Sequence, residues 1–250
     1  MGRGAPTSPF REVDTRRGGA AQRLTRNVPR TWQITGGIVR GGAVAVTGNL
    51  TVTQQTASGH LSLTPTPDAN PPTSTLNFPL GENRANGVTV PLSATGQLSV
   101  VYKSSVAGSR THVIFDITGY YLPGPDGFQY FPLNPGRLMD TRVSVMTGLS
   151  GPFVANSGRQ LETAGHLGIP SNAQAITGNL TVTQPTRPGH LALTPNPVND
   201  PFTSTLNFPA SDTRANGITE TLGSGSISIW FKAANGATVH AILDATGYFR

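Results

Sequence analysis

Residues 47–87 read TGNLTVTQQTASGHLSLTPTPDANPPTSTLNFPLGENRANG, and residues 177–217 read TGNLTVTQPTRPGHLALTPNPVNDPFTSTLNFPASDTRANG. The two stretches align without a gap, and 28 of the 41 positions are identical. The match extends outward to an Asp-Thr-Arg motif at residues 14–16 and 140–142. A repeat of this length is a whole domain, because one turn of a solenoid has a period of only about 20–50 residues. The chain therefore contains two copies of one unit.

The repeat predicts two domains and a linker. We expect the first unit to span residues 1–122 and the second to span residues 136–250. Residues 123–135 are rich in Pro and Gly and contain aromatic side chains, which indicates a linker that packs against the domains instead of remaining free. Each unit is long enough to enclose its own core.

Both units are predicted to consist of strands. In residues 43–54, apolar side chains alternate with Thr and Asn, and this period of two indicates a half-buried strand. Gly48 and Gly178 interrupt the apolar face, which predicts a bulge or a close backbone approach at both positions. The Asn-Gly pairs at residues 86–87 and 216–217 are typical of turns. Seven or eight short strands per unit predict an all-β fold of two tandem jelly-roll-like β-sandwich domains related by internal duplication.

Composition narrows the class of protein further. Charged residues make up 12% of the chain, about half the usual share, and Gly and Pro (30 and 21 residues) are abundant. The absence of cysteine excludes disulfides and thiol chemistry. No run of 18 apolar residues occurs, so we expect no membrane span. Residues 1–19 have charges but no apolar stretch behind them, and we expect no signal peptide there.

The net charge of +6 is concentrated in residues 1–40, where eight arginines face two acidic residues. One interpretation is an arm that contacts a polyanion or takes part in assembly. The other, which we favour, is a solvated leader that also supplies the first strand, because blocks of charge are usually solvated. The candidates for polyanion or assembly contact are Arg3, Arg11, Arg17, Arg23, Arg26 and Arg30.

A second group of charged residues occurs at matching positions in both units of this charge-poor chain. Buried charges are normally paired, and a carboxylate beside an arginine can tie a loop to a sheet through two parallel hydrogen bonds. We therefore interpret these residues as structural ion-pair candidates. They are Asp14, Arg16, Arg84, Asp116, Asp140, Arg142, Arg214 and Asp244.

The sequence contains no recognisable catalytic constellation. It has no nucleophile elbow, phosphate-binding loop or zinc-protease motif. His112 and Asp116 alternate along one strand face, but residues four apart on a strand are separated by roughly 13 Å, which is too far to share a metal or a proton. We expect no catalytic residue, no metal site and no cofactor.

Five motifs together resemble a known repeat module. They are Asp-Thr-Arg, NLTVTQPT (NLTVTQQT in the first unit), STLNF, RANG and the closing D-x-T-G-Y. In this combination the chain resembles a duplicated module of exported, mostly uncharacterised actinobacterial and Chloroflexi proteins. The resemblance covers nearly the whole chain twice. It implies a surface-exposed β-sandwich, and it implies no activity.

These observations predict a non-enzymatic structural protein whose main partner is itself. It would self-associate into a surface layer, filament or particle, in an extracellular or cell-surface location. Two alternatives remain open. A glycan- or cell-wall-binding module would need an exposed row of aromatic side chains and would have a surface glycan as its partner. A virus or phage shell protein would reside in the virion, where the Arg-rich arm could contact nucleic acid.

Overall fold

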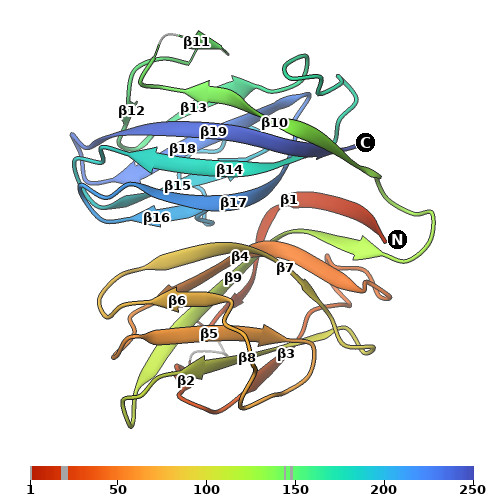
Figure 1. The fold of residues 1–250 in the computed structure, drawn as a ribbon, viewed down its shortest axis with the longest axis vertical. Helices are drawn as coiled ribbons and strands as arrows, with labels where there is room; N and C mark the ends of the chain where they lie inside the picture. Colours follow the sequence, from red (N-terminus) through yellow and green to blue (C-terminus); the bar gives the residue numbers. More distant parts are fainter. Residues whose placement is uncertain (1, 18–21, 144, 147–148) are drawn as a thin grey trace. The chain divides into compact units, whose positions relative to one another are not determined.

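The computed structural model describes residues 2–17, 22–143, 145–146 and 149–250. The chain forms two compact units, one comprising Met1–Ala5 and Phe10–Gly127 and the other comprising Pro6–Pro9 and Phe128–Arg250. The described residues form strands, turns and loops and no helix (Figure 1). Accordingly, this part of the chain has no helix that could cross a membrane.

The first unit is a sandwich of two sheets. One sheet has the strand order β1-β9-β4-β7, with the short β2 also paired to β9, and the other has the order β3-β8-β5-β6. The strands are β1 (Arg3–Asp14), β2 (Leu24–Thr25), β3 (Arg30–Gln33), β4 (Ala45–Thr53), β5 (Gly59–Thr64), β6 (Leu76–Phe78), β7 (Arg84–Pro91), β8 (Gln97–Lys103) and β9 (Arg110–Leu122).

The second unit repeats this arrangement. Its sheets have the orders β11-β10-β19-β14-β17, with β12 also paired to β19, and β13-β18-β15-β16. The strands are β10 (Tyr130–Asp140), β11 (Val145–Met146), β12 (Phe153–Val154), β13 (Ser157–Glu162), β14 (Ala175–Thr183), β15 (Gly189–Thr194), β16 (Leu206–Phe208), β17 (Arg214–Thr221), β18 (Ser226–Ala233) and β19 (Thr238–Phe249).

Both units are jelly rolls. When the eight principal strands of a unit are numbered in chain order, one sheet contains the first, eighth, third and sixth strands, and the other contains the second, seventh, fourth and fifth. This order, made of two Greek keys, defines the jelly roll. The predicted fold class is therefore confirmed, including the duplication.

Each core lies between the two sheets of its own unit. In β4, Val46, Leu50 and Val52 are fully buried and belong to one apolar cluster with Leu61 and Leu98 of the opposite sheet. The equivalent cluster in the second unit forms around β14, β18 and β19. Alternation places every second side chain of a strand on the core face, which explains why the period of two located these strands correctly.

The two predicted bulges are present. The ladder between β4 and β9 shifts register between Thr47 and Gly48, and the ladder between β14 and β19 shifts between Thr177 and Gly178. A Cβ atom at Gly48 or Gly178 would collide with the backbone carbonyl of Asp116 or Asp244, respectively. Both glycines are therefore required by close backbone approach.

Two local predictions from the sequence are wrong. The Asn-Gly pairs lie inside β7 and β17 and form no turn, because the asparagine side chains have tertiary partners: Asn86 Nδ2 donates to the Thr75 carbonyl at 2.8 Å, and Asn216 Nδ2 donates to the Thr205 carbonyl at 2.6 Å. The predicted linker is also too long. Residues 130–135 are the first half of β10, whose Tyr130 pairs with Phe249 of β19.

Candidate functional site

An arginine–aspartate network joins the first and last principal strands of the first unit. The Arg11 guanidinium, on β1, donates two hydrogen bonds to the Asp116 carboxylate on β9, with Nε–Oδ1 and Nη2–Oδ2 distances of 2.8 and 3.1 Å. At the end of β1, Arg16 binds the Asp14 carboxylate in the same two-pronged way, at 2.8 and 2.7 Å. An Arg11–Asp14 contact of 3.6 Å links the two pairs.

The second unit contains the same network. Arg137 on β10 pairs with Asp244 on β19, with an Nε–Oδ1 distance of 2.9 Å, and also reaches the Asp140 carboxylate at 3.1 Å. Arg142 completes the set with two bonds to Asp140, at 2.9 and 2.7 Å. Both units therefore contain a four-residue ionic network that connects the first principal strand to the last.

The threonine of each Asp-Thr-Arg motif takes part as well. The buried Thr15 hydroxyl accepts a hydrogen bond from the Val113 backbone N–H at 2.9 Å and lies 3.1 Å from Nδ1 of His112. In the second unit, Thr141 accepts from the Ala241 N–H at 3.0 Å and lies 3.0 Å from Nδ1 of His240. The threonine thus ties the motif directly to the last strand of its unit.

The electrostatics of the network follow from these contacts. Hydrogen bonds from the Arg16 guanidinium, opposed by burial, lower the pKa of Asp14 to about 2, and those from Arg142 lower the pKa of Asp140 to about 2. The two carboxylate side chains are only 6% and 2% exposed. Both acids are therefore ionised and saturated with donors at neutral pH, which suits a structural role and not proton transfer.

Acid should weaken both units through these two aspartates. A folded-state pKa near 2, below the unfolded value of about 3.9, stabilises the folded state above pH 4 and loses that stabilisation as pH falls toward 2. Across this pH window we expect the free energy of unfolding of each jelly roll to fall by at most about 2 kcal/mol, because solvent screening reduces the effect of the ion pairs. Urea unfolding at a series of pH values measures it. A free energy that stays constant between pH 4 and 2 would contradict the assignment.

The other two arginines among the ion-pair candidates lie elsewhere and have local partners. Arg84 contacts Glu82 at 3.2 Å, and Arg214 contacts Asp212 at 2.7 Å. The two networks contain Arg137, which was not predicted to take part, and Arg11, which was predicted to contact a polyanion or an assembly partner. The described residues contain no cluster of three or more potential metal ligands.

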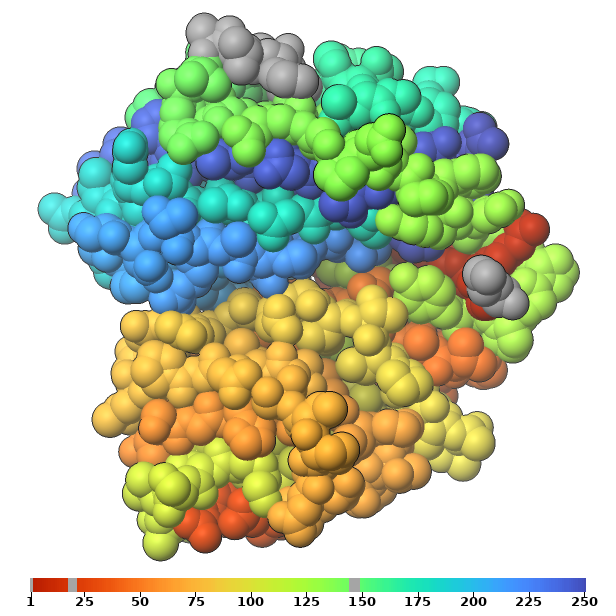
Figure 2. Space-filling model, in the orientation of Figure 1, coloured from red at the N-terminus to blue at the C-terminus, as the bar shows by residue number. Residues whose placement is uncertain are grey.

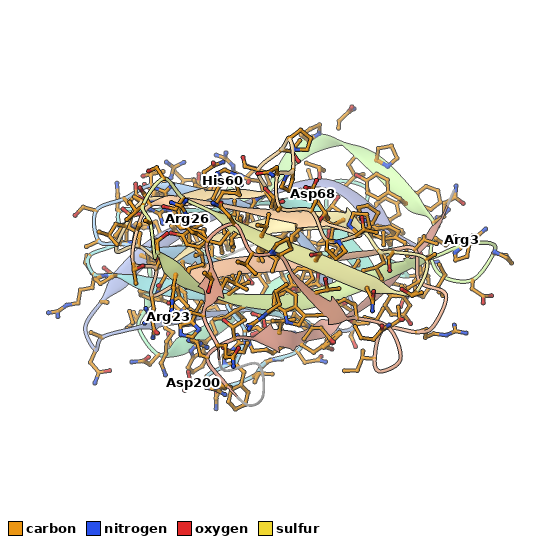
Figure 3. All side chains as sticks on the ribbon, turned by 90° about the horizontal axis from the view of Figure 1, so that it is seen from below. Arg3, Arg23, Arg26, His60, Asp68 and Asp200 are labelled. Carbon is orange, nitrogen blue, oxygen red and sulfur yellow. The ribbon has the colours of Figure 1, made fainter. Side chains whose placement is uncertain are left out.

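The basic N-terminal segment is not one continuous arm. Its first residues form β1, within a sheet of the first unit. Figure 3 shows Arg3 at one end of that unit and Arg23 and Arg26 toward the other. Several side chains are engaged: Arg3 donates to the Gly127 carbonyl at 3.5 Å, Arg26 to the Ser105 carbonyl at 3.1 Å and Arg30 to the Gln22 carbonyl at 2.8 Å.

Arg11, another candidate for polyanion or assembly contact, has its guanidinium paired with Asp116. Arg17 lies 3.7 Å from Asp14, and its side chain is 69% exposed. Arg23 has no hydrogen-bond or ion-pair partner within the described part of the chain. Exposed positive charge therefore remains at Arg17 and Arg23.

The loop after the fourth principal strand is anchored by a lysine in each unit. Lys103 Nζ donates to the Ala69 carbonyl and to Asn70 Oδ1, both at 2.8 Å. Lys232 Nζ binds Asp200 Oδ1 at 2.6 Å. These are the two lysines of the chain, which otherwise uses arginine as its cation. In Figure 2, β5, β6 and the loop between them are drawn in orange and form much of the visible surface of the first unit.

The two anchored loops differ in the side chains they expose. In the second unit, Phe202 is 82% exposed and Val198 is 46% exposed. The equivalent positions of the first unit are Pro72 and Asp68. Complete burial of a phenylalanine side chain is worth about 1.5–3 kcal/mol, and most of that free energy is unrealised at Phe202.

A group of aromatic residues lies along β10 and β19. Phe131 stacks on Tyr248 with ring centroids 5.2 Å apart, and Tyr130 packs on Phe249 at 5.3 Å. The Tyr130 hydroxyl contacts the Thr246 carbonyl at 3.3 Å. These rings pack against one another within the second unit. Each ring therefore has an aromatic partner, while Tyr130 remains 43% exposed.

Comparisons with known proteins identify no family. No protein-family model matches the chain, and a search of curated proteins also finds no match. Among solved structures, the chain is similar to a turret protein of Sulfolobus turreted icosahedral virus, with 12% identity, a TM-score of 0.21 and coverage of 96% of this chain and 98% of the other. It is also similar to the tandem CBM22 domain of Paenibacillus barcinonensis Xyn10C, with 7% identity, a TM-score of 0.26 and 98% of both chains covered.

Proposed function

We propose that the protein is a non-enzymatic structural protein that self-associates into a surface layer, filament or particle, and that the loop bearing Phe202 supplies one contact between copies. The location that fits this role is an exported, cell-surface one, as the resemblance to exported repeat modules implies. The exposure of Phe202 carries the proposal.

The loop suits a contact between proteins because its shape is set before binding. Pro195, Pro197 and Pro201 restrict its backbone, and the Lys232–Asp200 ion pair braces it. The Thr194 hydroxyl adds a hydrogen bond to the Asn196 carbonyl at 2.8 Å. A side chain presented by a preorganised loop loses little conformational entropy on binding, so more of its burial free energy appears as affinity.

The difference between the units favours head-to-tail association. Phe202 of the second unit has no aromatic equivalent in the first, whereas Leu80 of the first, 60% exposed, corresponds to Ala210 in the second. The two units therefore expose apolar side chains at different positions. In an assembly, the second unit of one molecule would contact the first unit of the next. Contacts between unlike surfaces produce rings or filaments, depending on whether the rotation closes.

Replacing Phe202 with serine should weaken the association. Loss of about 1.5–3 kcal/mol per contact corresponds to a roughly 10- to 150-fold weaker association constant. Sedimentation velocity and light scattering at micromolar concentration measure it, with electron microscopy of the assembled material. Pro72→Ser, at the equivalent position of the first unit, is the matched control and should leave the association unchanged.

A strict monomer of 26.1 kDa in the unsubstituted protein would contradict the proposal. Binding of that monomer to an insoluble cell-wall polysaccharide would instead support the glycan-binding alternative. The jelly-roll strand order favours a virus or phage shell protein as the second candidate, because viral capsid domains use this order. Closed particles in electron micrographs would support the shell protein, and sheets or filaments the surface structure.

A further inference from the structure

Glu220 occupies a core position in the second unit. It lies on β17 two residues after Ile218 and two residues before Leu222, which follows the end of the strand, and both of these residues belong to the apolar core cluster. Its register partner on β14 is the fully buried Ile176. Glu220 itself is 2% exposed. The strand therefore directs a carboxyl group into the interior of the sandwich.

Nothing on the neighbouring strands compensates a charge at this position. The Oε1 atom of Glu220 has no hydrogen-bond partner among the described residues. β17 packs on β14, β15 and β16, of which β14 and β16 contain no titratable residue. His190 of β15 alternates with the core residues Leu191 and Leu193, so it faces away from the core.

The remaining candidates are also distant or neutral. Arg214, the other charged residue of β17, stands at the opposite end of the strand and pairs with Asp212. Pro6–Pro9, grouped in the same unit, contains no titratable side chain. The described neighbours therefore offer Glu220 no cation.

The first unit shows that the fold does not need this carboxyl. The equivalent register pair there is Val46 with Val90, where the second unit has Ile176 with Glu220. Val90 packs against the apolar cluster of the first unit. The second unit thus has a glutamate at the position where the first unit has a valine.

Burial raises the pKa of Glu220 well above 4.5, and the backbone N–H of Thr221 offsets this only partly. The unfolded chain releases the proton above about pH 4.5, whereas the folded chain retains it, so folding must take up a proton. The contribution of Glu220 to the stability of the second unit is therefore fully present below pH 4.5 and decreases as pH rises, until the folded-state carboxyl ionises as well.

We propose that Glu220 makes the second jelly roll an alkali-sensitive module: ionisation of the buried carboxyl releases β17 from the end of its sheet, whereas β7 of the first unit, with Val90 at the equivalent position, stays in place. β17 is suited to this because it ends the strand order and is paired with β14 alone in that order. A terminal strand can leave a sheet without breaking ladders on both of its sides.

Native-state hydrogen exchange of the full chain, followed by mass spectrometry from pH 5 to 9 and corrected for intrinsic rates, tests this. The opening equilibrium constant of peptides covering β17 should rise by about tenfold per pH unit. Peptides covering β7 should not show this rise. Glu220→Val and Glu220→Gln should both abolish the pH dependence, and Val90→Glu should transfer it to β7.

Two outcomes would overturn the proposal. One is protection of β17 that does not change with pH, and the other is an unchanged slope in Glu220→Val. Because Glu220→Gln keeps the shape of the side chain, its comparison with the unsubstituted protein decides the question even if Val90→Glu does not fold.

Discussion

Replacing Gly178 with alanine is expected to lower the melting temperature of the second unit by about 10 °C, which corresponds to about 3 kcal/mol. The new methyl group would collide with the backbone carbonyl of Asp244 on β19, at the bulge in the centre of the sheet. Backbone on a paired inner strand cannot move aside without breaking the ladder. The cost should therefore exceed the usual one for exchanging glycine and alanine in a strand.

Gly217→Ala is the matched control for this prediction. Gly217 lies on the adjacent β17, opposite Asn179, and an added Cβ there would meet no heavy atom within 4 Å. Calorimetry should show a shift for Gly178→Ala and almost none for Gly217→Ala. Gly48→Ala should produce the equivalent loss in the first unit. Similar melting temperatures for the two variants of the second unit would show that the bulge tolerates a side chain.

The second large effect is expected for Asp140→Ala, which removes the shared carboxylate of the ionic network. Asp140 accepts hydrogen bonds from Arg142 and Arg137 and from the backbone N–H of Arg142 at 3.1 Å. We expect a loss of about 2 kcal/mol at pH 7, because a 2% exposed carboxylate with several donors stabilises far more than a surface ion pair does.

Asp200→Ala is the control, because its carboxylate is 62% exposed and binds a lysine that is itself 41% exposed. Exposed pairs contribute about 0.2–1 kcal/mol, so this change should be small. The deficit of Asp140→Ala should also disappear near pH 2, where the unsubstituted carboxyl becomes protonated. A deficit that persists at that pH would assign the loss to packing and not to charge.

Much of the architecture could be predicted because it depends on local patterns. The period of two located β4 and β14, and the glycines that interrupt it marked both bulges. A duplicated sequence implies duplicated topology, since the same alternation must bury the same face twice. The ionic networks could be anticipated only as a set of charges, because the pairing of Asp116 with Arg11 depends on β1 lying beside β9, which sequence separation does not reveal.

The sequence by itself determined that the chain is all-β, duplicated and jelly-roll-like, because strand periodicity and turn composition are properties of neighbouring residues. Only the tertiary structure decided which side of each strand is covered. The alternation at Ile218, Glu220 and Leu222 shows that these side chains share a face, but only the packing of the second sheet makes that face the core. Likewise, the exposure of Phe202 is decided by tertiary contacts of its loop with residues far away in the sequence, such as the contact between Asp200 and Lys232.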